Sequence, residues 1–370
     1  MIKWNFLTKS RVLLVGVAFI LLAVFFRPTT AFEYNSIYTP TSGVLTYKQP
    51  TTTGCNGFEQ SQSAGGTVPL RVVAPAASGT YPVLLFSHGM NGLNTQQAWL
   101  TDYLAQYGYI VLSMEHTASD ACANLKFPLD DSVFTARSNN VNTVLNHLNE
   151  IESRLNKSSK WTYTFDTAHI GFVGYSLGAE TGLMKMPATY KLGSGPVNYG
   201  DARLKAFFLM AGNLGDNLQH PQTPQGLDQS PANLALLTSP MFWVSGGADT
   251  AMHAKWAWDL ELAAPPGNYY EHAPAMDHFS YLPSGDTKFQ TSIEQFACAF
   301  FDSKLMDSTF FRHASALAAL TNATAYSGNL LKNTYELVSN NSPTTPKWYG
   351  SPLTVNGKYV GYATHTAAQD

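Results

Sequence analysis

One pentapeptide limits the possible folds of this chain more than any other feature. A serine lies between two glycines in Gly174-Tyr175-Ser176-Leu177-Gly178, and the strand-like run His169 to Val173 comes directly before it. The residues that follow are small or apolar and can open a helix. A bulky side chain at either glycine would obstruct a sharp strand-to-helix turn, the kind of turn that holds a serine clear of a sheet. The pattern therefore predicts a strand, a strained turn with Ser176 at its tip, and a helix.

The rest of the chain shows the element pattern that such a turn requires. Short apolar runs alternate with helical segments from Gly43 onward, which is typical of an α/β fold. The runs are continuous, so we expect a mostly parallel eight-stranded sheet with helices on both faces. The predicted strands are Val44–Lys48, Thr67–Ala74, Tyr81–Phe86, Tyr109–Met114, His169–Val173, Leu204–Met210, Pro240–Ser245 and Asn268–Ala273, and apolar spacing predicts helices at Gln97–Tyr107, Ser138–Leu155 and Thr291–Lys304.

Composition and charge narrow the class of protein. The 370 residues are 45% hydrophobic, which is enough apolar material for one large core. A formal net charge of -3 gives no electrostatic reason to expect nucleic acid as a partner. Beyond Lys304 the sequence becomes rich in serine, threonine and asparagine. We therefore expect a catalytic domain over residues 32–304, an appended C-terminal segment over 305–370, and a monomer.

The first residues have the features of a targeting segment. A basic stretch precedes the uncharged run Val12 to Phe26, and the small residues Thr29 and Ala31 follow it. This arrangement predicts a signal peptide over residues 1–31 and a secreted or periplasmic protein. The apolar run is shorter than the roughly 20 residues that span a bilayer. The alternatives are an uncleaved N-terminal segment that anchors the protein to a membrane and a buried helix of the fold.

An activated serine needs a base and a carboxylate, and on sheets of this type they follow the serine in the order acid, then histidine. Asp249 comes after the strand Pro240–Ser245 and would emerge at the carboxyl edge of the sheet, so we favour it as the acid. Asp216 and Asp228 are competitors in the Pro/Gln/Asn-rich segment 212–239. A helix N-cap is the structural alternative for Asp249.

The same order leaves four histidines as candidate bases. His253 is only one helical turn past Asp249, and His272 lies at the end of the last expected strand. His313 lies beyond the last expected helix. His278 follows the last strand in a loop from which an imidazole can reach Ser176, so we predict that His278 is the base.

Acyl transfer also needs two N–H groups directed at the developing oxyanion. One comes from the residue after the nucleophile, here Leu177. The other comes from the loop after the third strand, where Ser87-His88-Gly89-Met90 makes Met90 the expected donor. We expect His88 to organise this loop rather than to act as a base. No cluster of histidine, cysteine and acidic residues has metal spacing, and no glycine-rich dinucleotide loop follows the first strand, so neither a metal nor a cofactor is expected.

Several of these motifs together resemble a known superfamily. The segments Tyr81 to Gly89 and Gly108 to His116 are similar to the platelet-activating-factor acetylhydrolase and predicted dienelactone-hydrolase branch of the α/β-hydrolases. Gly247-Ala248-Asp249, with His278-Phe279, is more similar to cutinase-like polyester hydrolases. The resemblance covers roughly residues 65 to 300. It implies the α/β-hydrolase fold and serine esterase activity. The elbow carries serine, where dienelactone hydrolases proper have cysteine.

The resemblance also suggests how the three cysteines pair. In this fold the second strand runs antiparallel to the others, so its start lies at the same edge as the end of the fourth strand. Cys55 precedes the second strand and Cys122 follows the fourth. We therefore expect a disulfide between Cys55 and Cys122, with Cys298 unpaired inside an apolar helix.

Three functions from different classes fit these features. The first is a carboxylester hydrolase that acts on neutral lipophilic esters through an acyl-enzyme. The second is an interfacial lipase or phospholipase of the platelet-activating-factor acetylhydrolase type, which contacts a lipid surface transiently and is covered by the segment 212–239. The third is a binding protein that kept the fold without the chemistry. A small-molecule or lipid ester is the expected substrate of the first two.

Overall fold

The computed structural model describes most of the expected catalytic domain. The segment 1–31, in which we expect a signal peptide, lies outside the described residues. Among the described residues, no helix is both long enough and apolar enough to cross a membrane. The described residues are 44–47, 63–64, 68–121, 123–126, 129–212, 226–228, 230–252, 268–273, 276–285, 287–306, 316, 320, 336–339, 352–355 and 358–362.

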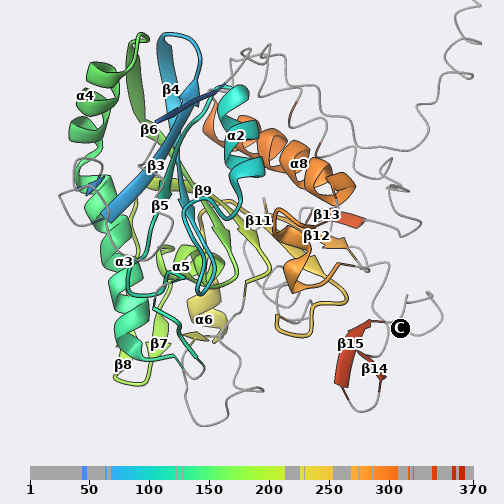
Figure 1. Ribbon diagram of the computed structural model, residues 1–370. Coiled ribbons are helices and arrows are strands. Elements are labelled where there is room, and N and C mark those ends of the chain that lie inside the picture. The colour runs from blue at the N-terminus through green and yellow to red at the C-terminus, as the bar shows by residue number, and fades with distance from the viewer. Residues whose placement is uncertain are drawn as a thin grey trace, which may run out of the picture.

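A central β-sheet forms the middle layer of the described chain (Figure 1). Its strand order is β1-β3-β5-β4-β6-β9-β11-β12-β13, and β2 pairs with β3 off this path. The first eight strands of this order are those that the sequence predicts, so the expected mostly parallel sheet is confirmed, extended by β2 and β13. Their bounds are β1 Val44–Tyr47, β2 Ser63–Ala64, β3 Val68–Pro75, β4 Gly79–Ser87, β5 Ile110–Met114, β6 Tyr163–Tyr175, β9 Leu204–Met210, β11 Met241–Gly246, β12 Tyr269–Ala273 and β13 Glu336–Ser339.

The strand directions place the chemistry at one edge of the sheet. β3 runs antiparallel to both β1 and β5, as the resemblance implies for the second strand. β4, β5, β6, β9, β11 and β12 are parallel to one another. Their carboxyl ends therefore meet at a single edge, where ligands bind in open α/β sheets. The loops after β4, β6 and β11 carry the segments in which we expect the oxyanion donor, the nucleophile and the acid.

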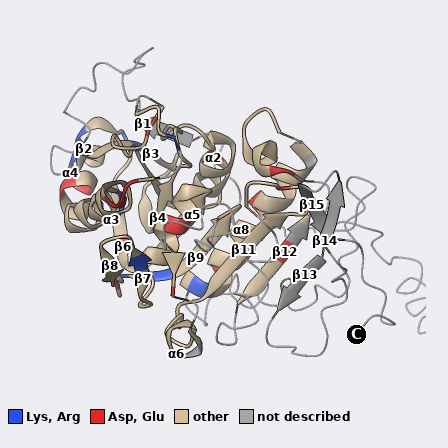
Figure 2. Ribbon diagram, turned by 90° about the horizontal axis from the view of Figure 1, so that it is seen from below, with Lys and Arg blue, Asp and Glu red and all other residues tan. Residues whose placement is uncertain are grey.

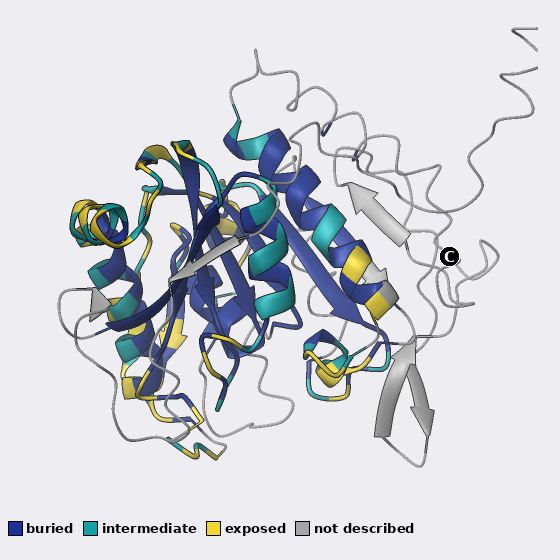
Figure 3. Cartoon of the chain, turned by 45° about the horizontal axis from the view of Figure 1, so that its top comes forward, coloured by how far each residue is buried: buried dark blue, intermediate teal, exposed yellow. Residues whose placement is uncertain are grey.

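Helices cover both faces of the sheet, and Figure 3 shows the strands buried between them. Along β4, Val83 and Leu85 join one core cluster while Leu84 and Phe86 join the other, and all four are fully buried. This explains why the run is continuous rather than alternating. The first cluster contains residues of α3 (Asp131–Asn146), α4 (Leu148–Ser158) and α5 (Leu177–Met184), and the second contains residues of α2 (Ala98–Gln106) and α8 (Thr287–Leu305).

One predicted helix is two helices in the structure. The apolar spacing predicts a single helix over Ser138–Leu155, whereas α3 ends before His147 and α4 begins after it. His147 has φ -116° and ψ 18°, and its Nδ1 bonds the Thr143 carbonyl oxygen at 2.7 Å. The apolar residues keep their spacing across this break, so the periodicity does not reveal it. The first turns of α3 were also missed, although Asp130 caps them by accepting a hydrogen bond from the Ser132 N–H at 2.8 Å.

Smaller elements occupy the regions that the sequence leaves irregular. β7 (Tyr190–Leu192), β8 (Gly195–Val197) and β10 (Gly226–Leu227) form a three-stranded sheet, and α6 (Pro231–Leu234) follows it. Residues 213–225 of the expected cover lie outside the described chain. Within the expected appended segment, β13 pairs with β12 and so extends the central sheet, while β14 (Pro352–Val355) and β15 (Lys358–Tyr362) form a hairpin.

Candidate active site

Ser176 occupies the predicted turn between β6 and α5. Its backbone has φ 54° and ψ -122°, a conformation that residues with a side chain rarely adopt. A Cβ at Gly174 would lie 2.4 Å from the Gly178 carbonyl oxygen, and one at Gly178 would lie 1.9 Å from the Ser87 carbonyl oxygen. Both flanking positions therefore require glycine. The Ser176 N–H donates to the Met210 carbonyl oxygen at 2.9 Å, which ties the turn to β9.

The structure brings His278 and Asp249 together with Ser176. His278 Nε2 lies 2.9 Å from Ser176 Oγ, and His278 Nδ1 lies 2.9 Å from Asp249 Oδ2. The other carboxylate oxygen of Asp249 accepts hydrogen bonds from the N–H groups of Ala251 and Met252 at 2.8 and 2.7 Å. Asp249 thus caps the turn that follows it and bonds the imidazole with its second oxygen. The two interpretations of this residue are compatible.

A short 3-10 helix sets the position of His278. This helix, η2 (His278–Tyr281), begins directly after Asp277. Asp277 Oδ1 accepts from the Phe279 N–H at 3.1 Å and from Ser280 Oγ at 2.7 Å, and Ser280 Oγ accepts from the Asp277 N–H at 3.0 Å. This reciprocal capping fixes the backbone of the residue that carries the imidazole.

Of the competing acids and bases, Asp228 is the one whose side chain the structure describes, and it lies away from this cluster. Asp228 lies beside the small sheet, where it pairs with Lys191 at 3.2 Å and accepts from the Ser230 N–H at 3.0 Å. Asp216, His253 and His313 lie outside the described residues, and so does the side chain of His272.

The loop after β4 places Met90 beside Ser176. A Cβ at Gly89 would lie 3.2 Å from Ser176 Cβ, which shows how closely the loop approaches the turn. The Gly89 N–H donates to Gln96 Oε1 at 3.1 Å, and the Asn91 N–H donates to the Ser119 carbonyl oxygen at 2.9 Å. Within the described residues no acceptor bonds the Met90 N–H, nor the Leu177 N–H in the first turn of α5. Both expected donors are therefore available to a ligand.

A cavity of about 230 Å³ opens over these groups, and its wall is mostly apolar. Among the described residues that line it there is no lysine or arginine. Phe279, at the side of His278, is 65% exposed. The lining residues are Gly89, Met90, Gln96, Tyr175, Ser176, Leu177, Glu180, Ala251, Met252, His278, Phe279 and Leu282.

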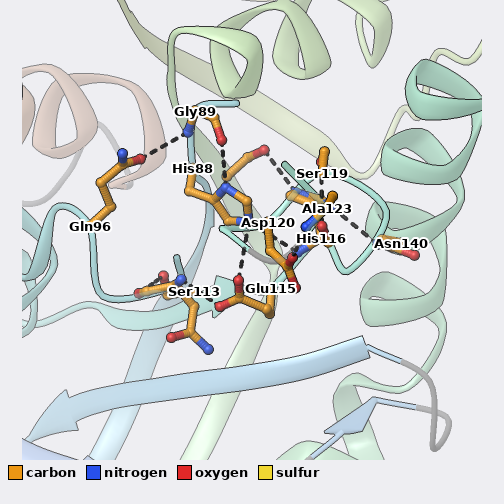
Figure 4. Close-up of polar contacts among 12 residues, drawn as sticks. His88, Gly89, Gln96, Ser113, Glu115, His116, Ser119, Asp120, Ala123 and Asn140 are labelled. Atoms are coloured by element: carbon orange, nitrogen blue, oxygen red, sulfur yellow. Dashed lines mark hydrogen bonds and ion pairs between the residues drawn. The ribbon is translucent and has the colours of Figure 1, made fainter. Parts of the chain in front are cut away.

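His88 is structural, as expected. Its Nδ1–H donates to the Gly89 carbonyl oxygen at 2.7 Å, and its Nε2 accepts from the His116 N–H at 3.0 Å (Figure 4). Burial, with the nearby Arg137 cation, lowers the pKa of His88 to about 3. The imidazole is neutral at physiological pH. It joins the loop after β4, which carries Met90, to the segment after β5. Glu115, also in Figure 4, accepts from the Asn94 N–H at 2.7 Å, and burial raises its pKa to about 8.

Arg137 is a buried residue that the sequence motifs do not include. It lies fully buried in α3, next to the loop after β4. Its guanidinium donates to Ser87 Oγ at 3.0 Å, to Ser119 Oγ at 2.7 Å and to Thr181 Oγ1 at 2.9 Å, and it also bonds the His88 carbonyl oxygen. One side chain thereby connects the end of β4, the segment after β5 and helix α5. A signal was present: Arg137 lies four residues from both Val133 and Val141, on the apolar face of its helix.

Tyr175, the residue before Ser176 in the motif, contacts the expected base. Its hydroxyl donates to the His278 carbonyl oxygen at 2.7 Å, and the two rings lie 5.4 Å apart between centroids. The residue before the nucleophile thus holds the backbone of His278. We infer that Tyr175 is a positioning residue for the base.

Tyr175→Phe tests this inference. The ring packing stays and one hydrogen bond is lost, so we expect kcat for p-nitrophenyl butyrate to fall about fivefold while KM changes little. Tyr199→Phe is the matched control, because it removes the hydroxyl that lies 3.0 Å from Thr135 Oγ1, away from the cavity lining. An unchanged kcat in Tyr175→Phe would contradict the positioning role, as would an equal loss in the control.

Two other expectations concern cysteines and metals. Cys55 and Cys122 lie outside the described residues, so their disulfide stays a prediction. Cys298 is buried in α8 and is not disulfide-bonded. In the part of the chain that the structure describes, no group of three or more histidine, cysteine or acidic residues could hold a metal ion.

Comparison with known proteins gives one family match. The chlorophyllase family model matches residues 41–182. This match is less than half of the chain and runs from β1 through most of α5, so it includes Met90, Ser176 and Leu177 but neither Asp249 nor His278. The family is a family of ester-cleaving enzymes. No curated protein matches the chain.

Proposed function

This chain belongs to the α/β-hydrolase superfamily of serine esterases, and from that premise we propose that it is a secreted carboxylester hydrolase that cleaves neutral lipophilic esters through an acyl-enzyme. The observation that carries the proposal is the hydrogen-bonded series Asp249, His278 and Ser176 beside two N–H groups that have no acceptor within the described residues. Acyl transfer needs each of these parts.

Each group has one task in the proposed reaction. Ser176 Oγ attacks the ester carbonyl carbon while His278 Nε2 takes the hydroxyl proton. The carbonyl oxygen becomes an oxyanion that accepts from the N–H groups of Met90 and Leu177. The tetrahedral intermediate collapses, the C–O bond to the alcohol breaks, and His278 returns the proton to the leaving oxygen. Water then repeats the sequence on the acyl-enzyme and releases the acid. Asp249 keeps Nδ1 protonated and stabilises the imidazolium.

The lining of the cavity supports a neutral substrate. A charged group moved from water into a mostly apolar cavity needs a partner, and the described lining offers no lysine or arginine. The volume of about 230 Å³ favours short and medium acyl chains. The proposal therefore extends to the charge and the size of the substrate.

A pair of matched esters tests this selectivity. We expect kcat/KM for p-nitrophenyl butyrate to exceed that for mono-p-nitrophenyl succinate by at least tenfold, because the succinate carboxylate would be buried without a cation. The neutral methyl p-nitrophenyl succinate is the control for length and should recover the activity. Faster hydrolysis of the charged ester would contradict the proposal, since it would require a cationic group to reach the cavity from residues outside those described.

One observation favours the interfacial alternative as a second candidate. Phe279 lines the cavity and is 65% exposed, so an apolar side chain stands in solvent beside His278. Such a residue can insert into a lipid surface. An enzyme that acts at interfaces should gain activity when the same ester passes from solution to emulsion. Phe279→Ser should lower that gain by more than it lowers the rate on dissolved ester.

A further inference from the structure

Glu180 lies in the cavity but has no task in the proposed reaction. It is one helical turn after Ser176 in α5, where its N–H donates to the Ser176 carbonyl oxygen at 3.2 Å. Glu180 lines the cavity together with Ser176 and is 6% exposed. Figure 2 shows α5 close to β4 and β9, and Glu180 is the one acidic residue of this helix.

The neighbours of the Glu180 carboxyl group leave part of it available to hydrogen-bond a substrate. Tyr190, from β7, donates its hydroxyl to Glu180 Oε2 at 3.3 Å. Arg137, from α3, is the nearby cation, but its described hydrogen bonds go to Ser87, His88, Ser119 and Thr181. His278, from η2, and Tyr175, from β6, are the other titratable groups that line the cavity in the described residues. The carboxyl group is therefore hydrogen-bonded by one neutral hydroxyl and paired with neither cation nor base.

Burial decides the protonation state of this group. It raises the pKa of Glu180 to about 8, against the smaller opposing effects of the Tyr190 hydrogen bond and the Arg137 charge. Below that pH the side chain is a neutral carboxylic acid, which donates one hydrogen bond and also accepts. Above it the side chain becomes an anion that only accepts. A neutral donor beside a nucleophile in an apolar cavity is a recognition group for an acceptor oxygen.

We propose that Glu180 determines substrate specificity by donating a hydrogen bond to an acceptor oxygen that the substrate carries near its scissile ester. The preferred substrates are then neutral esters with an oxo or alkoxy group, rather than esters of unsubstituted hydrocarbon acids. The inference rests on the proposed ester hydrolase function and deepens it. Neither the nucleophile, the base nor the acid is reassigned.

The test compares two esters of equal chain length, p-nitrophenyl 4-oxopentanoate and p-nitrophenyl pentanoate. At pH 6.5 we expect the wild-type ratio of kcat/KM, oxo ester over plain ester, to exceed that of Glu180→Leu by about fivefold, the usual effect of one neutral hydrogen bond. Glu180→Gln keeps a donor and should keep the ratio within about twofold. Glu150→Gln, on the surface of α4, is the matched control and should leave the ratio unchanged. p-Nitrophenyl methoxyacetate against butyrate repeats the comparison with an ether oxygen.

A pH series supplies a second readout that a merely structural role would not move. The wild-type ratio should fall as pH rises from 6.5 to 9, because Glu180 loses its proton around pH 8. In Glu180→Gln the ratio should stay flat. Taking a ratio cancels any effect of pH on the chemical steps that both esters share. A wild-type ratio that does not change with pH, or equal ratios in the wild type and Glu180→Leu, would overturn the inference.

Failure of the proposed function gives a different result. If the wild-type protein hydrolyses neither ester and an organophosphonate does not label Ser176, the ester hydrolase function itself is wrong. If both esters are cleaved without discrimination, only the role of Glu180 is wrong. Labelling each variant with the same phosphonate shows whether Ser176 is still reactive. If Glu180→Leu is not labelled, the pH series of the wild type against Glu180→Gln decides the inference.

Discussion

Ser176→Ala is expected to lower kcat for p-nitrophenyl butyrate by about 10⁴-fold or more, the range found when the nucleophile of a serine hydrolase is removed. The side chain is small, and the strained backbone at this position is held by its flanking glycines and by the bond from the Ser176 N–H to Met210. The variant should therefore fold like the wild type. The measurement is steady-state hydrolysis together with circular dichroism, and Ser158→Ala on α4 is a control that should keep full activity. Residual activity above a few per cent would contradict the assignment.

The same experiment has a stronger form, because Ser176 and His278 would act as one unit. His278 Nε2 has a role only when it can take a proton from Ser176 Oγ, 2.9 Å away. We expect His278→Ala to lose about as much activity as Ser176→Ala, and the double variant to lose no more than either single one. Asp249→Asn should be the mildest of the three changes. Additive losses would show that the two side chains work separately.

The sequence was most informative where a short motif follows directly on a predicted strand of the sheet. The Gly-x-Ser-x-Gly motif, the buried strand before it and the donor loop after β4 could all be predicted, because each depends on residues adjacent in the chain. Asp249 and His278 required a further argument from chain order. The structure brings both to the serine, although they lie 73 and 102 residues after it. Their catalytic roles stay predictions.

What the sequence did not reveal depends on neighbours that are distant in the chain. The break at His147 occurs within an unbroken apolar repeat, so periodicity could not show it. The neighbours of Glu180 along the chain do not reveal its surroundings, because the hydroxyl that bonds it belongs to Tyr190 of the small sheet. Arg137 interrupts an apolar helix face, but only the assembled fold shows that its guanidinium bonds groups at the end of β4 and within α5.

Arg137→Met should produce the largest loss of stability among the changes considered. The substitution removes four hydrogen bonds and leaves Ser87 Oγ, the His88 carbonyl oxygen, Ser119 Oγ and Thr181 Oγ1 each without one of their bonds. Breaking a buried charged network in this way typically costs about 3 to 5 kcal/mol of unfolding free energy. Arg137→Lys should recover only part of that loss, because a single ammonium group cannot reach acceptors on several sides at once. Urea unfolding followed by tryptophan fluorescence measures both variants.

The control for this prediction is Arg154→Met on α4. Arg154 forms an exposed pair with Glu150, and such pairs contribute at most about 1 kcal/mol. The activity of the folded fraction separates two roles of Arg137. The guanidinium bonds the His88 carbonyl oxygen and could thereby position the loop after β4 that carries Met90. In that case kcat should fall in Arg137→Lys under conditions where the variant remains folded, while KM changes little. If Arg137→Lys is destabilised but fully active, the role of Arg137 is limited to stability. If Arg137→Met loses no more unfolding free energy than Arg154→Met, the buried network contributes little to stability.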